Sequence, residues 1–127
     1  MMLPWKSRAQ AEAAAEQLKV FAQPQRLLIL SLLLSGEQSV TEIADAADIG
    51  QPALSQQLAE LRRTNMVGTR RQSKQVYYRL ADEGVTLRVR NIVAAFVGEA
   101  GLPRDVAVPR EAPAAGPVGA AMFARIC

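Results

Sequence analysis

Apolar residues recur every three or four positions over most of this chain, which is the spacing of helices that bury one face. Residues 8–22 are rich in Ala, Glu and Gln and predict a first helix, anchored by Leu18 and Phe21. A second helix is predicted after Pro24, and it is apolar on nearly every side until Gly36 ends it. This second helix is expected to be the centre of the core.

Two shorter helices are predicted next, joined by a tight turn. The first covers residues 39–48, where apolar residues have helical spacing and Ser39 or Thr41 can cap the start. Gly50 permits the turn, and Pro52 is expected in the first turn of the following helix, where its missing N–H does no harm. Two helices in this order predict a helix-turn-helix.

The second of these helices, within the sequence GQPALSQQLAELRR at residues 50–63, has two unlike sides. Leu54, Leu58 and Leu61 form an inward stripe at i, i+4 and i+7. The opposite side carries Gln51, Pro52, Ser55, Gln56 and Gln57. Glu and Lys suit an ordinary solvated helix face better than Gln and Ser, so this side is predicted to contact something other than water.

From Met66 onward the apolar period changes from helical to two, which predicts strands. Residues 67–69 and 76–80 alternate on either side of the sequence RQSK at residues 71–74. The segment therefore predicts a β-hairpin with a basic tip. Its tyrosines, Tyr77 and Tyr78, are expected to be packing residues of the hairpin. Tyrosines in a hairpin can also stack on the bases of a nucleic acid, but that role is not expected here.

Residues 82–100 return to the helical period, with Asp82 placed to cap the start. One stripe of this last helix carries Val85, Val89, Ile92, Val93, Phe96 and Val97. A helix with so wide an apolar stripe needs a partner surface.

The predicted architecture is mainly α with a small β-hairpin: a winged helix-turn-helix of about five helices plus a two-stranded wing. Residues 1–101 are expected to form this single domain. Residues 102–127 contain four of the seven prolines and are expected to be a flexible tail.

Positive charge is concentrated just after the two-sided helix. Residues 62–79 contain six of the 15 basic residues and none of the 12 acidic ones, so the nine remaining basic residues leave the rest of the chain at −3. A basic surface on an acidic body is typical of a protein that binds a polyanion, although a solvated run of charges is the plainer alternative. The residues predicted to hold DNA phosphates are Arg62, Arg63, Arg70, Arg71 and Lys74.

A recognition helix must approach base edges closely, which favours small, amide-bearing and hydroxyl-bearing side chains. Gln56 and Gln57 can pair with adenine in the major groove, and Ser55 can bond a base or a phosphate. Pro52 can meet a thymine methyl group, and Gln51 lies on the same side. These five residues are predicted to read bases in double-stranded DNA; a surface helix with incidental amides is the alternative.

Several other classes of protein fit the sequence poorly. The chain has no histidine to serve as a general base and its single cysteine is Cys127, so an enzyme is not expected. The longest apolar run, residues 27–34, is shorter than the roughly 20 residues of a membrane helix, and the start of the chain lacks a secretory signal. A single cysteine suits a reducing compartment, so the expected location is cytoplasmic. Neither a metal nor another cofactor is expected.

Residues 17–97 resemble the ArsR/SmtB family of dimeric winged-helix repressors. The segments LKVFAQPQRLLIL, GEQSVTEIADAADIGQPALSQQLAELRRTNMV and TRRQSKQVYYRLAD carry the resemblance. It implies a homodimer that binds an imperfect palindrome near a promoter and pairs mainly through its first and last helices. The residues then expected at the dimer interface are Leu18, Phe21, Val85, Val89, Ile92, Val93 and Phe96.

The chain departs from this family where other members bind their signals. Sensors of soft metals carry cysteines in the third helix, where this chain has Ser39 and Thr41, and hydroxyls do not replace thiolates. Members that bind zinc, nickel or cobalt on the last helix use histidine, which this chain lacks. Members with a cysteine pair place thiols in the second and last helices, where this chain has Ser31 and no cysteine. The expected inducer is therefore non-metal or unidentified, and Cys127 is expected to be an inert thiol.

Two other binding functions are alternatives. A nonspecific architectural DNA-binding protein would use the same basic hairpin but would not need the amide-bearing helix. A protein-interaction module would use the apolar last helix. The sequence favours a sequence-specific transcriptional regulator, and only the resemblance favours repression over activation.

Overall fold

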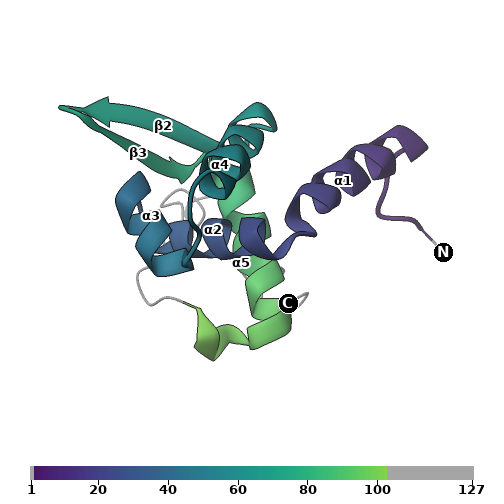
Figure 1. The fold of residues 1–127 in the computed structure, drawn as a ribbon. Helices are drawn as coiled ribbons and strands as arrows, with labels where there is room; N and C mark the ends of the chain where they lie inside the picture. Colours follow the sequence, from purple (N-terminus) through teal and green to yellow (C-terminus); the bar gives the residue numbers. More distant parts are fainter. Residues whose placement is uncertain (1, 103–127) are drawn as a thin grey trace.

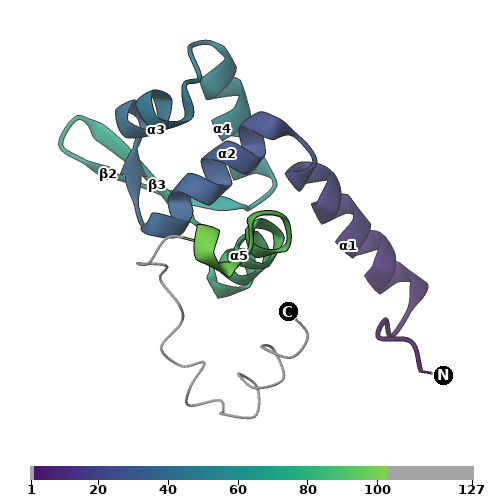
Figure 2. The same cartoon turned by 90° about the horizontal axis from the view of Figure 1, so that it is seen from below.

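The computed structural model describes residues 2–102 of the 127-residue chain. Within that range, five α-helices and two short 3-10 helices accompany a three-stranded antiparallel sheet. Figure 1 shows α1 (Arg8–Phe21) projecting away from a body centred on α2 (Pro24–Leu32). In Figure 2, α2 lies between α5 (Glu83–Val97) on one side and α3 (Val40–Ala47) and α4 (Ala53–Arg63) on the other. The predicted order of helices and hairpin is confirmed.

The first two helices have clear physical starts and stops. The Ser7 hydroxyl accepts a hydrogen bond from the Gln10 N–H at 3.1 Å and caps α1. Helix α2 starts with Pro24, at a position that needs no N–H, and it continues into the 3-10 helix η1 (Leu33–Ser35). Gly36 ends η1 at φ +123°, a conformation that favours glycine.

The helix-turn-helix consists of α3 and α4. Helix α3 begins with a capping box, in which the Glu42 N–H donates to the Ser39 hydroxyl at 3.2 Å and the Ser39 N–H donates to the Glu42 carboxylate at 2.7 Å. Of the two predicted caps, Ser39 is therefore the one used. Pro52 lies one residue earlier than predicted, because α4 begins at Ala53 and Pro52 occupies the preceding cap position.

The wing consists of strands β2 (Val67–Gln72) and β3 (Gln75–Leu80). A third strand, β1 (Gln38–Ser39), pairs with the other edge of β3, so the strand order is β1-β3-β2. The sequence did not predict β1, because two residues are too few to show a period of two. The turn is also shorter than predicted: β2 runs through Gln72, which leaves only residues 73–74 between the strands.

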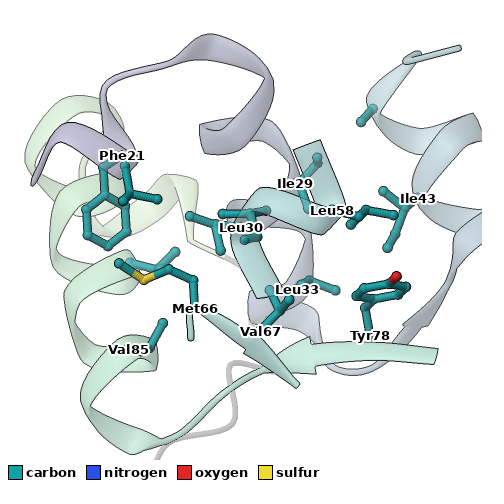
Figure 3. Packing of buried hydrophobic residues seen from close by; sticks show 14 of the residues in the cluster. Phe21, Ile29, Leu30, Leu33, Ile43, Leu58, Met66, Val67, Tyr78 and Val85 are labelled. Carbon is teal, nitrogen blue, oxygen red and sulfur yellow. The ribbon is translucent and has the colours of Figure 1, made fainter. Parts of the chain in front are cut away.

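The core lies where α2 meets the inner faces of the other elements. Figure 3 shows Ile29 and Leu30 of α2 between Phe21 on one side and Ile43 and Leu58 on the other. The fully enclosed large side chains are Ile29, Leu30, Leu34, Ile43, Leu54, Leu61, Met66 and Val89. The predicted inward stripe of α4 is confirmed, since its three leucines are at most 3% exposed. This burial directs the opposite side of α4 outward.

Three residues expected at a dimer interface belong to this core instead. Phe21, Val85 and Val89 are at most 4% exposed within the single chain, so they have almost no surface left for a partner. The sequence pattern shows that α5 is apolar but does not show which part of its stripe α2 covers. Leu18 and Phe96, in contrast, are 57% and 86% exposed.

The predicted tail meets the structure only at its first residue. Leu102 packs against the core, although the sequence predicts flexibility from that residue onward. The rest of the segment, Cys127 included, lies outside the described residues. None of the helices in residues 2–102 combines the length and the apolar character that crossing a membrane requires.

Candidate nucleic-acid interface

The solvent side of α4 is the side that the sequence singles out for base reading. The exposed residues at its start are Gln51, Pro52, Ser55 and Gln56. Within residues 2–102 the Gln56 amide has no hydrogen-bond partner. A free amide can donate and accept at once, which is what pairing with adenine in the major groove requires.

Gln51 and Ser55 are bonded to each other. The Gln51 Oε1 accepts from the Ser55 N–H at 3.1 Å and from the Ser55 hydroxyl at 2.5 Å. The first bond satisfies one of the N–H groups that the start of a helix leaves without a partner. Gln51 is therefore both part of the predicted reading surface and a cap of α4.

Gln57 does not present the free amide that the sequence predicts. Its Oε1 accepts from the Arg26 Nε at 2.9 Å, and its Nε2 donates to Gln23 at 3.1 Å and to Gln25 at 3.3 Å. The helical period places Gln57 on the polar side of α4, but it does not reveal that the start of α2 lies beside it. The predicted base-reading role of Gln57 is not supported, because both ends of its amide are engaged.

The two arginines at the end of α4 have different surroundings. Arg63 pairs with Glu60: its Nε donates to the carboxylate at 3.0 Å, and its Nη2 donates to the second carboxylate oxygen. Hydrogen bonding lowers the pKa of Glu60 and raises the pKa of Arg63. Arg62 is exposed and forms no ion pair within the described range. Of the two, Arg62 is the one free to contact a phosphate without losing a carboxylate.

Arg70 of the wing is paired with an acidic residue from outside the hairpin. Its Nε donates to both oxygens of Glu37 at 2.8 Å, and its Nη2 lies 2.7 Å from one of them. The guanidinium also lies over the Tyr77 ring, 4.8 Å from its centre. The hydrogen bond from Arg70 lowers the pKa of Glu37, and the same bond raises the pKa of Arg70. Arg70 therefore faces solvent with much of its charge compensated.

Arg71 and Lys74 are the other two cations near the tip of the wing, and the strand register puts Arg71 on a different face from Arg70. Arg71 is opposite Val76 and Arg70 is opposite Tyr77, and directly opposed residues share a face, so the two arginines point to opposite faces of the hairpin. Arg71 and Lys74 are exposed and form no ion pair in the part of the chain that the structure describes. These two are the uncompensated charges at the tip of the wing.

The resemblance directs attention to Ser39, one of the two positions in the third helix where soft-metal sensors are expected to carry cysteines. The Ser39 hydroxyl is committed to the capping box of α3. Over residues 2–102, no three His, Cys, Asp or Glu side chains come together in a way that could hold a metal ion.

The arrangement of α3, α4 and the wing corresponds to that of known regulators. Residues 23–69 match the family model described as "Bacterial regulatory protein, arsR family". The biofilm growth-associated repressor of Agrobacterium fabrum is 43% identical over 86 residues, which cover 68% of this chain and 74% of that protein. The chain belongs to the arsR family of bacterial regulatory proteins.

Solved structures of other regulators share the fold of this arsR-family chain. The transcriptional repressor BigR from Xylella fastidiosa aligns with a TM-score of 0.68 at 38% identity, over 75% of this chain and 97% of that chain. HlyU from Vibrio cholerae aligns with a TM-score of 0.67 at 34% identity, over 71% and 98%. The predicted winged helix-turn-helix is thereby confirmed, and the chain is a DNA-binding transcriptional regulator. This family of regulators is not a class of enzymes.

Two residues that shape this interface, Glu37 and Arg26, were not predicted from the sequence. Glu37 reaches the wing only because β1 pairs with β3, and no local pattern reveals that pairing. The sequence does contain a clue to Arg26, because it is a cation at the start of a strongly apolar helix. The structure shows that Arg26 is half-buried, and a half-buried cation needs a polar partner. What the sequence could not supply was the identity of that partner, Gln57.

Proposed function

We propose that this arsR-family chain is a homodimeric repressor that binds an imperfect palindromic operator in double-stranded DNA. Helix α4 and the turn before it enter the major groove, where Gln51 and Pro52 of the turn and Ser55 and Gln56 of the helix read bases. The wing and the end of α4 hold the phosphates through Arg62, Arg71 and Lys74, whereas the Arg63 and Arg70 predicted for the same role stay paired with Glu60 and Glu37. In this arrangement the base contacts specify the site and the phosphate contacts set the register.

The observation that carries the proposal is the contrast between the two sides of α4. The leucines at 54, 58 and 61 bury one side of the helix in the core, while Gln56 on the opposite side offers an unused amide to solvent. Arg71 and Lys74 add uncompensated positive charge on the neighbouring wing. A nonspecific binder would need the charges but not the amide.

Pairing of the two copies is proposed to use α1 and α5. Leu18 and Phe96 are the exposed apolar residues of the predicted interface, and Ile92 and Val93 lie half-buried beside the core. A groove of about 290 Å³ between α1 and α5 has an apolar lining that includes Trp5 and Leu18. Reading two half-sites one turn of DNA apart requires the two α4 helices of the dimer to lie about 34 Å apart.

Repression is proposed over activation because two of the relatives described above, BigR and the Agrobacterium protein, are named repressors. The HlyU relative is named an activator, so activation is the alternative. The inducer is proposed to be non-metal or a signal not yet identified, because residues 2–102 contain neither cysteine nor histidine, the ligands that soft and borderline metals prefer. We propose that the protein acts in the cytoplasm, as residues 1–101 forming one DNA-binding and dimerisation domain.

The test selects an operator from genomic fragments with the wild-type protein and then compares Gln56→Ala with the wild type by fluorescence anisotropy. Wild type is expected to bind the operator tighter than random duplex by about 4 kcal/mol or more at one fixed salt concentration. Gln56→Ala is expected to lose about 1–3 kcal/mol on the operator and little on random DNA. Arg71→Ala is the control that weakens binding to both.

Three results would contradict the proposal. An equal loss for Gln56→Ala on both DNAs would show that this residue does not read bases. Equal wild-type affinity for operator and random duplex would identify a nonspecific architectural protein. Failure to bind any native promoter, with a stable heteromer recovered instead, would identify an interaction module.

A further inference from the structure

A cluster of polar side chains joins the reading helix to the beginning of α2. It consists of Gln23, Gln25, Arg26 and Gln57, and we call it the Arg26–Gln57 bracket. Thirty-one residues separate Arg26 from Gln57 in the sequence, yet the Arg26 Nε donates to the Gln57 Oε1 at 2.9 Å. Arg26, Gln25 and Gln57 are all half-buried.

The hydrogen bonds of the bracket fix the orientation of the Gln57 amide. The amide oxygen receives the charged donor of Arg26, while the amide nitrogen donates to the side-chain oxygens of Gln23 and Gln25. Reversing the amide would place its nitrogen against the guanidinium and its oxygen against two other oxygens. A charge-assisted bond of this kind is stronger than a neutral one, so it holds the side chain and the segment of α4 that carries it.

The bracket lies where three helices meet. Gln23 precedes α2, Arg26 is in the first turn of α2, and Gln57 is in the middle of α4. Arg26 also donates through Nη1 to the carbonyl oxygen of Val20, in the last turn of α1, at a longer distance of 3.5 Å. The junction between α1 and α2 is therefore connected to α4 through one arginine side chain.

The facing ends of α1 and α4 carry charged side chains above the buried Val20 and Met66. A groove of about 370 Å³ lies between the two helix ends, and its lining includes Lys19, Arg26, Glu60 and Arg63. Gln56, the free amide of the reading surface, is the immediate neighbour of Gln57 in α4. Because the two residues are neighbours in one helix, a displacement of the α4 backbone at Gln57 also displaces Gln56.

We propose that Arg26 and Gln57 are positioning residues for base reading. The bracket sets the angle at which α4 presents Gln56 to the DNA, and it transmits movement of the α1–α2 junction to the reading surface. This inference rests on the proposed function, because it concerns how the same surface recognises its operator. It reassigns Gln57 from a base contact to a residue that acts through its neighbours.

The test is a double-mutant cycle with Arg26→Met, Gln57→Met and the double variant, with Gln56→Ala as the matched control on the adjacent amide. Affinity is measured by anisotropy on the wild-type operator and on a panel in which each base pair of one half-site is changed in turn. A stoichiometric titration with operator measures the fraction of each preparation that can bind DNA, and all affinities are corrected for that fraction. Thermal unfolding is recorded in parallel. Arg26→Lys and Gln57→Asn replace the methionine variants if those fail to fold.

Each single methionine variant is expected to weaken operator binding on the order of tenfold, and the double variant to be about as weak as either single variant. Both single variants are expected to flatten base discrimination in the same way, at several base pairs. Gln56→Ala is expected to flatten it at one. A purely structural role would lower the unfolding temperature but leave the discrimination of the folded protein unchanged.

The inference is overturned if Gln57→Met flattens discrimination at one base pair while Arg26→Met flattens none, since Gln57 would then read a base directly. Additive losses, or an unchanged discrimination profile in both variants, would also overturn it. A wild-type protein that discriminates no base pair is a different outcome, because it contradicts the proposed function itself.

Discussion

The ion pair between Glu37 and Arg70 makes a specific prediction about the salt dependence of DNA binding. In wild type the Glu37 carboxylate holds Arg70 through three contacts of 2.7–2.8 Å, so this cation is already neutralised before DNA arrives. Glu37→Gln removes the negative charge and keeps the shape of the side chain. Arg70 then becomes an additional free cation on the wing.

The size of the effect follows from counterion release. Each phosphate neutralised by a protein cation adds about 0.9 to the magnitude of the slope of log K against log salt, so the two copies of Arg70 in the proposed homodimer add about 1.8. A fourfold rise in salt concentration should therefore weaken binding of the variant about 12 times more than it weakens binding of wild type. At low salt the variant should bind any duplex more tightly, because a phosphate contact carries no sequence information.

The assay measures anisotropy on random duplex over a salt series. Asp45→Asn on the exposed surface of α3 is the control for loss of one negative charge, and it should leave the slope unchanged. The hydrogen bond from Arg70 holds the pKa of Glu37 below its ordinary value of 4.5, so the carboxylate stays ionised and the difference should persist between about pH 6 and 8. Lowering the pH through that depressed pKa should make wild type behave like the variant. Equal slopes for wild type and Glu37→Gln would refute the reasoning, because they would show that DNA displaces Glu37 unaided.

Three further predictions concern stability and assembly. Leu61→Ala removes a side chain that is 0% exposed and should lower the free energy of unfolding by about 2–5 kcal/mol in urea titrations; a loss below 1 kcal/mol would mean that the site collapses fully. Ser39→Ala removes the capping hydroxyl of α3 and should cost about 1 kcal/mol in the same assay, whereas Thr41→Ala should cost less because Thr41 does not cap the helix. Phe96→Ser should raise the dimer dissociation constant by on the order of tenfold or more in analytical ultracentrifugation without destabilising the single chain; an unchanged constant would place the interface elsewhere.

The order of elements was predictable because each one has a local cause. Pro24 and Asp82 mark the starts of helices, and the change of apolar period at Met66 marks the wing. The inward stripe of α4 was predictable for the same reason, because three leucines at helical spacing share one face and that face must be buried. Short elements were less accessible, as the two-residue strand β1 illustrates.

The environment of the site residues was less predictable than their identity. The sequence predicts that α4 exposes amides, but which amide stays free depends on contacts between distant segments. Arg26 engages Gln57 across 31 residues, and Glu37 engages Arg70 across 33. Likewise, apolar spacing alone does not divide α5 between its own core and a second copy, so Val85 and Phe96 look alike in the sequence although they are 3% and 86% exposed.

The strict pairing of β2 with β3 limits how this protein can diverge. The register places Arg70 beside Glu37 and Arg71 on the reverse side of the ribbon, and deleting one residue before them would move Arg71 into the position of Arg70 and turn Arg70 to the reverse side. The misplaced Arg71 would meet the carboxylate, and Arg70 would be left unpaired. Viable changes of hairpin length should therefore come as two-residue steps within the strands or be confined to the bend at residues 73–74.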